Sequence, residues 1–103
     1  MGSVGAALLA DNGQIYTGAC IDLPSGIGFC AEHAAVAAML KDKQTYVRAI
    51  IALGHDGKIL PPCGRCRELL DKIDARNRDT EVTVAEGKTV KLSDLLPFPW
   101  RET

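Results

Sequence analysis

Two short stretches of this 103-residue chain carry the side chains that could do chemistry, Cys30-Ala31-Glu32-His33 and Pro61-Pro62-Cys63-Gly64-Arg65-Cys66. The two cysteines of the second stretch can both reach one metal ion from a single turn, and the cysteine of the first stretch can supply a third ligand. Structural zinc sites are usually closed by four protein ligands, whereas catalytic sites keep one position for water. Three cysteines with a glutamate beside them therefore predict a hydrolytic zinc site.

Glu32 follows Cys30 by two residues and is expected on the first turn of a helix, beside the metal but not bound to it. From there its carboxylate could take a proton from a metal-bound water and pass it to the substrate, which is general acid–base catalysis. Taken alone, a glutamate at this place would be a surface side chain facing the helix N-terminus. The neighbouring cysteines favour the catalytic interpretation.

The Cys-x-x-Cys spacing by itself is a weak signal, because redox pairs have the same spacing. In the redox interpretation Cys63 is the nucleophile and Cys66 is the resolving thiol. This alternative leaves Cys30 and Glu32 without a role, so it is the less favoured one.

The sequence pattern predicts elements that bring the two stretches together in one α/β domain spanning residues 1–103. A hairpin turn at Asp11-Asn12-Gly13 separates two strands, and a Gly- and Pro-containing loop follows at 22–29. Strands are expected at 4–10, 14–21, 48–53 and 81–85, with a further element at 89–92 and a short helix at 93–96. Helices from 30 to about 42 and from 64 or 65 to about 75 would place the cysteines at helix N-termini, where thiolates are stabilised.

The composition excludes several classes of partner. Twelve basic and thirteen acidic residues give a net charge of -1, which provides no field to attract nucleic acid or a membrane surface. No run approaches the roughly 20 apolar residues of a membrane span, and the N-terminus lacks the pattern of a signal peptide. We therefore expect a small-molecule substrate and a cytoplasmic location, where cysteines are more often ligands or buried thiols than disulfides.

The motifs of the two stretches resemble those of a known family. Cys-Ala-Glu followed by Pro-Cys-Gly-Arg-Cys-Arg-Glu is similar to the motifs of the zinc-dependent cytidine deaminases. The segments 4–9, 16–18 and 95–98 are also similar to that family, so the resemblance covers nearly the whole chain. It implies a three-layer α/β/α fold with a mixed central sheet. It also implies hydrolytic removal of the exocyclic amine from the cytosine ring of a free nucleoside or nucleoside analogue.

The resemblance also implies a role for each site residue. Zinc would be bound by Cys30, Cys63 and Cys66, and a zinc-bound hydroxide would attack C4 of the ring while Glu32 shuttles protons. The Ala31 N–H would contact the pyrimidine O2, and the Pro61 carbonyl would contact the departing amine. A cysteine as first ligand is similar to the small, commonly tetrameric nucleoside deaminases, which implies a homo-oligomer (a tetramer or dimer) in which Phe98 or Trp100 lines a shared pocket.

The sequence departs from the family pattern in three places. Cys20-Ile21-Asp22 stands where nucleoside deaminases usually place Asn-x-Glu to hold the ribose, although Asp22 could still accept a hydrogen bond from a sugar hydroxyl. His33 stands where many members have an arginine that offsets thiolate charge, which shifts that role toward Arg67. The family's N-terminal helix is missing, so one wall of the pocket or one face of the sheet is expected to be bare.

Two alternatives to a cytidine deaminase stay open from the sequence. Blasticidin S deaminases share the Pro-Cys-Gly-x-Cys-Arg pattern and also vary at the ribose-binding positions. A non-catalytic, zinc-bearing interaction domain would explain both the altered ribose positions and the missing helix.

Overall fold

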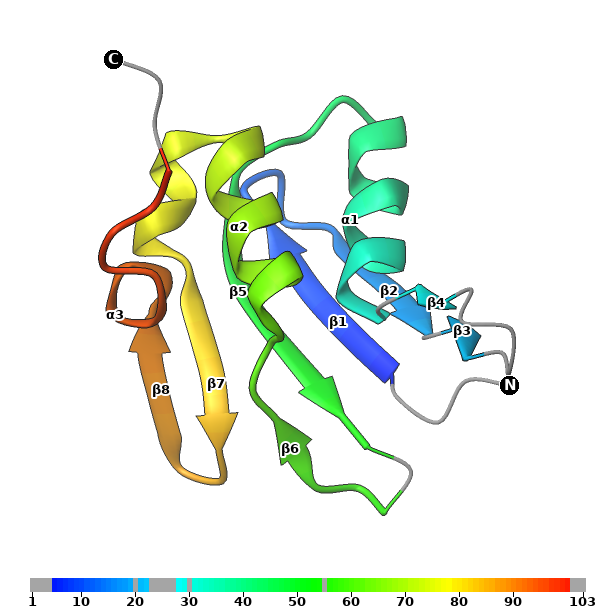
Figure 1. Cartoon of the computed structure of the whole chain (residues 1–103). Coiled ribbons are helices and arrows are strands. Elements are labelled where there is room, and N and C mark those ends of the chain that lie inside the picture. Colours follow the sequence, from blue (N-terminus) through cyan, green and yellow to red (C-terminus); the bar gives the residue numbers. More distant parts are fainter. Residues whose placement is uncertain (1–4, 20, 23–27, 30, 55, 101–103) are drawn as a thin grey trace.

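The computed structural model describes residues 5–19, 21–22, 28–29, 31–54 and 56–100. The strands of its central sheet are β1 (Gly5–Ala10), β2 (Ile15–Ala19), β5 (Val47–Leu53), β6 (Ile59–Leu60), β7 (Glu81–Ala85) and β8 (Lys88–Lys91). Their order is β2-β1-β5-β7-β8, and β6 pairs with β5 outside this path. β5 and β7 run parallel, and the other pairs of this sheet are antiparallel (Figure 1).

The helices form one layer on this sheet. They are α1 (Ala31–Lys41), α2 (Gly64–Ile73) and α3 (Leu92–Leu95), with a 3-10 helix η1 (Ala75–Asp79) between α2 and β7. Leu8, Ile50 and Val82 lie in register across β1, β5 and β7. These side chains are buried in a single core with residues of all three α-helices, namely Ala35, Val36, Met39, Leu70 and Leu92.

The predicted α/β class with a mixed sheet is therefore confirmed. In the part of the chain that the structure describes, all three α-helices pack on the same face, so the second helical layer of the expected three-layer fold is not found there. The opposite face, which we call the open face, carries side chains that alternate with the buried ones. It has a hollow of about 240 Å³ lined by Ala7, Leu9, Ile15, Ala49, Ile51 and Thr83.

Three features were not predicted from the sequence. β6 and η1 were missed, and the 22–29 loop contains a short ladder in which β3 (Ile21–Asp22) pairs with β4 (Gly28–Phe29). The hairpin turn was predicted correctly, because Gly13 has a φ of +83° and the Ala10 N–H donates to the Gln14 carbonyl at 3.0 Å. None of the described helices is long and apolar enough to cross a bilayer.

Candidate active site

Small residues bring the N-terminus of α1 down onto the sheet. Ala31, the first residue of α1, is buried in a cluster with Ala6 of β1 and Ala52 of β5. Gly18 of β2 faces the same turn, and a Cβ atom added there would lie 2.6 Å from the Ala31 carbonyl oxygen and from the Ala34 Cβ atom. This close approach requires a glycine, and it fixes the first turn of α1 at the end of the sheet where the second cysteine stretch also arrives.

Glu32 lies on this first turn and is 7% exposed. It lines a narrow hollow together with Pro62 and residues of β5, β6 and β7. Such burial disagrees with the alternative interpretation of Glu32 as a surface side chain, and it places a carboxylate where water can be excluded. Buried carboxylates are suited to moving protons rather than to forming surface ion pairs.

The two cysteines of the second stretch meet at the N-terminus of α2. Cys63 is the N-cap residue, with an extended backbone, and Cys66 is buried in the first turn. Their Sγ atoms are 3.4 Å apart. Two sulfurs bound to one zinc ion at about 2.3 Å each lie roughly 3.8 Å apart at a tetrahedral angle. The observed distance is close to this value, so the pair fits a shared metal ion and the helix N-terminus favours its thiolate form.

His33 connects the two stretches. Its Nδ1 atom is 3.4 Å from the Cys66 Sγ atom, so the first turn of α1 contacts the first turn of α2. Burial lowers the pKa of His33 below its usual range, the charge of Arg65 adds to this effect, and the charge of Glu32 opposes it. The two motifs, which lie far apart in the sequence, are therefore in direct contact.

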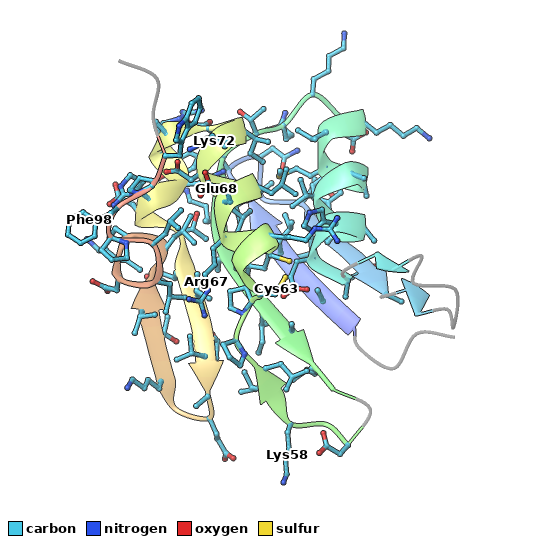
Figure 2. All side chains as sticks on the ribbon, in the orientation of Figure 1. Lys58, Cys63, Arg67, Glu68, Lys72 and Phe98 are labelled. Atoms are coloured by element: carbon cyan, nitrogen blue, oxygen red, sulfur yellow. The ribbon has the colours of Figure 1, made fainter. Side chains whose placement is uncertain are left out.

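Arg67 is bound to main-chain oxygens on both sides. Its Nε atom donates to the Pro62 carbonyl at 2.9 Å, and its Nη1 atom donates to the Leu95 carbonyl at 3.2 Å. Figure 2 shows its side chain below α2, on the side of α3. The idea that Arg67 offsets thiolate charge stays a prediction. The two carbonyl bonds were not foreseen from the sequence, although a double proline one turn before an arginine is a usable signal, because prolines offer only carbonyls for hydrogen bonding.

The other expected site residues are placed less closely together. Cys30, the expected metal ligand from the first stretch, lies outside the described residues. The described residues contain no group of three or more His, Cys, Asp or Glu side chains that could hold a metal. Pro61 is exposed just before α2, and Asp22 pairs through its backbone with Gly28. Phe98 is 93% exposed and lies beside α3, well apart from Cys63 (Figure 2).

Comparisons with known proteins agree with this arrangement. No family model matches the chain. The chain is 39% identical over 97 residues to the cytidine deaminase of Mycobacterium tuberculosis, which covers 92% of this chain and 70% of that protein. It is 31% identical to the cytidine deaminase of Halalkalibacterium halodurans, over 91% of this chain and 74% of the relative.

Solved structures give the same result for the fold. The crystal structure of cytidine deaminase from M. tuberculosis matches with a TM-score of 0.85 and 32% identity, covering 96% of this chain and 79% of that one. The enzyme from Mycobacterium leprae matches with a TM-score of 0.82 and 27% identity, over 92% of this chain and 78% of that one. The family predicted from the two cysteine stretches is confirmed, and the chain belongs to the cytidine deaminase family.

Proposed function

We propose that this chain hydrolyses the exocyclic amine of cytosine in a free nucleoside, converting cytidine or deoxycytidine to uridine or deoxyuridine with release of ammonia. One observation carries the proposal: the buried Glu32 lies at the first turn of α1, and this turn contacts the Cys63 and Cys66 pair through His33. The 39% identity to a cytidine deaminase supports the choice of substrate class.

Zinc is the cofactor in this proposal, and Cys30, Cys63 and Cys66 are its ligands. The 3.4 Å separation of the two sulfurs at a helix N-terminus supports the assignment of the second and third ligands. When bound, zinc supplies Lewis acidity that lowers the pKa of a water molecule toward neutrality. Ligation by thiolates also supports a cytoplasmic location, because a reducing compartment keeps cysteines available.

The chain's own residues then move the protons. Glu32 takes a proton from the attacking water as oxygen adds to C4, and it delivers the proton to the neighbouring ring nitrogen. Glu32 then takes the proton of the new C4 hydroxyl and passes it to the exocyclic amine, so that the C4–N bond breaks, ammonia leaves and a carbonyl remains. The Ala31 N–H, which is unpaired within its helix as a first-turn donor, is suited to the pyrimidine O2. The Pro61 carbonyl accepts from the departing amine, and Asp22 accepts from a sugar hydroxyl.

The decisive experiment is a deamination screen with zinc-loaded protein. Cytidine, deoxycytidine, cytosine and blasticidin S are tested with the wild type, with Glu32→Gln and with Glu68→Gln. Glu68 is a carboxylate on α2 that pairs with Lys72 at 3.0 Å, so its substitution is the matched control. We expect nucleoside turnover by the wild type and the control. Glu32→Gln should keep its zinc and its melting temperature but lose on the order of 10²- to 10⁴-fold in kcat.

Other outcomes separate the alternatives. Turnover of blasticidin S without turnover of cytidine would favour the blasticidin S-type assignment. Full zinc loading with no turnover of any substrate would favour a non-catalytic, zinc-bearing interaction domain. A disulfide between Cys63 and Cys66 without bound zinc would favour the redox alternative.

Assembly belongs to the same proposal. We infer a homo-oligomer, a dimer or a tetramer, in which Phe98 contributes to a neighbouring subunit's pocket. The exposure of Phe98 (93%) and Trp100 (67%) two residues apart supports it, since large apolar side chains exposed together mark interaction sites.

A further inference from the structure

We propose that Arg67 is a positioning residue for the candidate active site. Its guanidinium holds the segment formed by Pro61, Pro62 and Cys63 in place by binding the Pro62 carbonyl oxygen and connecting it to the end of α3. The part of this inference that concerns turnover rests on the proposed function, whereas the part that concerns metal retention does not depend on the substrate.

The contacts of Arg67 are concentrated on this segment. The guanidinium donates to the Pro62 carbonyl at 2.9 Å, and the main-chain N–H of the same residue donates to the Cys63 carbonyl at 3.1 Å. The main-chain bond is the first hydrogen bond of α2 and any non-proline residue would make it, whereas the bond to the Pro62 carbonyl, next to a proposed zinc ligand, depends on the arginine side chain. The remaining described contact, at 3.2 Å, goes to the Leu95 carbonyl.

The double proline makes these bonds important. Neither Pro61 nor Pro62 has a backbone N–H, so neither can be fastened by donating a hydrogen bond. The Pro61 and Pro62 carbonyls lie in the two peptide planes that meet at the Pro62 Cα atom. The pyrrolidine ring fixes φ of Pro62, so only the ψ angle of Pro62 can rotate one carbonyl relative to the other. Holding the Pro62 carbonyl therefore also restricts the Pro61 carbonyl, which is proposed to accept from the departing amine.

The end of α3, to which Arg67 connects the segment, is anchored in the core. Leu92 is fully buried, and the Leu96 N–H donates to its carbonyl at 3.0 Å, which closes the turn of α3. Arg78 donates to the next carbonyl, that of Leu96, also at 3.2 Å. The other described partner of Arg78 is the buried carboxylate of Asp71 at 3.5 Å. Arg78 thus makes the same kind of bond to α3 without reaching the cysteine segment, which makes it the matched control for Arg67.

Loss of Arg67 should act on both the metal and the reaction. Pro62 lines the same hollow as Glu32, so movement of the segment changes the distance between the proton shuttle and the Cys63 sulfur. Residues that orient metal ligands without binding the metal typically change metal affinity or activity by about 10- to 100-fold. The Pro61 carbonyl is proposed to contact the amine as it departs, which is a contact of the reaction rather than of substrate binding. Its loss should therefore lower kcat more than it raises KM.

The test compares zinc-loaded Arg67→Ala, Arg67→Lys and Arg78→Ala with the wild type. Zinc release to a chromogenic chelator, thermal unfolding, and kcat and KM for cytidine are measured for each. We expect Arg67→Ala to release zinc about tenfold faster or more and to lose a similar factor in kcat, with KM changed less. Arg67→Lys, which lacks the forked guanidinium, should be intermediate. Arg78→Ala should lower the melting temperature but leave zinc release and kcat as in the wild type.

Equal zinc release and kcat in Arg67→Ala and Arg78→Ala would overturn the inference, because Arg67 would then have only a general structural role. If Arg67→Ala does not fold, Arg67→Lys is used in its place. Zinc release and kcat equal to those of the wild type in Arg67→Lys would then overturn the inference. Faster zinc release in Arg67→Ala, in a protein whose wild type does not turn over cytidine, would support the positioning role while rejecting the proposed function.

Discussion

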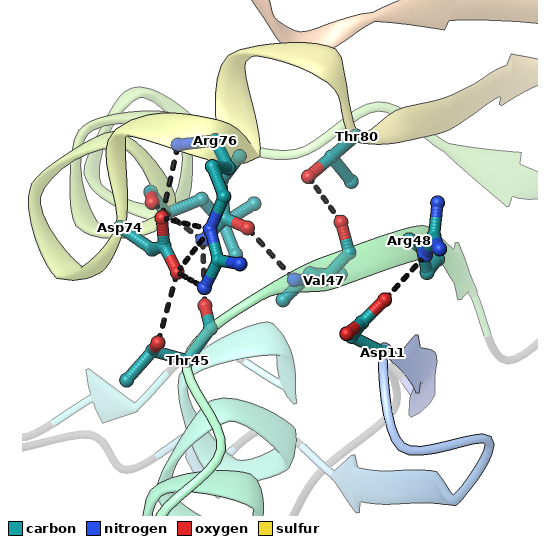
Figure 3. A network of polar contacts seen from close by, with 9 residues as sticks. Asp11, Thr45, Val47, Arg48, Asp74, Arg76 and Thr80 are labelled. Atoms are coloured by element: carbon teal, nitrogen blue, oxygen red, sulfur yellow. Dashed lines mark hydrogen bonds and ion pairs between the residues drawn. The ribbon is translucent and has the colours of Figure 1, made fainter.

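At the scale of single residues, Asp74 shows how one carboxylate can tie two elements together. Its side chain accepts from Thr45 Oγ1 at 2.9 Å, from Arg76 Nη2 at 2.7 Å and from the Arg76 main-chain N–H at 3.0 Å (Figure 3). The hydrogen bond from the Arg76 side chain is the main cause that lowers the pKa of Asp74 from 3.8 to about 2, and burial opposes it. The folded state therefore favours the ionised carboxylate.

This pKa predicts how stability depends on pH. Because the folded pKa lies below the unfolded one, the stabilisation is complete above about pH 4 and is lost as the pH falls toward 2. Asp74→Asn should lower the free energy of unfolding at pH 7 by about 1–2 kcal/mol. This value is smaller than the pKa shift alone would give, because Arg76 is exposed and solvent screens its charge. Urea unfolding at several pH values checks this, with the exposed Asp79→Asn as control. A difference from wild type that stays constant between pH 5 and pH 2 would contradict it.

At this scale, the relative placement of side chains could be predicted where it depends on local spacing. Cys63, Cys66 and Glu32 were chosen because short spacings fix how side chains lie on one helical turn, and the structure brings their two stretches into contact. The Leu95 partner of Arg67 and the Cys66 partner of His33 lie 28 and 33 residues away, respectively. Spacing holds no information on such long-range contacts, which is why the sequence did not reveal them.

At the scale of elements, the predictions succeed where hydrophobic periodicity is strong and fail where tertiary contacts decide. The elements α1, α2, β1, β2, β5 and β7 were predicted within a few residues. The missed η1 contains the fully buried Asn77. Its side-chain oxygen accepts from the Val47 N–H at 2.7 Å, and its amide donates to the carbonyls of Thr45 and Leu70 at 3.0 and 2.8 Å. A run of charged residues around one asparagine gives no sign of this anchoring role.

The contact between β2 and α1 gives a prediction for these two elements. Gly18→Ala should push back the first turn of α1, because its Cβ would lie 2.6 Å from three atoms of that helix. We expect a loss of about 1–3 kcal/mol in the free energy of unfolding, as overpacking typically costs, together with a lower kcat because Glu32 moves with the turn. Chemical denaturation and deaminase assays measure both. Gly5→Ala on β1 is the control, since its Cβ would meet only an ordinary contact at 3.9 Å, and equal effects in the two variants would contradict the prediction.

At the scale of the whole molecule, the described chain presents two separate apolar surfaces. One is the open face of the sheet, where Ile15 is 67% exposed beside the hollow. The other is the C-terminal segment with Phe98 and Trp100. This segment is fastened to α2 by Lys72, which donates to the Trp100 carbonyl and lies over the Trp100 ring at 5.7 Å. Because the segment is fastened, its aromatic side chains are held ready for a contact at little cost in conformational entropy.

The C-terminal segment and the open face can be tested separately as the interface of the proposed assembly. Phe98→Ala should shift the protein from a dimer or tetramer toward smaller species in light scattering coupled to size-exclusion chromatography. It should also raise KM for cytidine, because a neighbouring pocket loses one wall. Ile15→Ala removes an exposed side chain of the open face and should leave both mass and KM unchanged. Dissociation by Ile15→Ala instead would place the interface on the open face, and a monomeric wild type with full deaminase activity would contradict a shared pocket altogether.

Trp100→Ala tests whether the contact extends along the segment, with a smaller expected shift because Trp100 is already partly covered by Lys72.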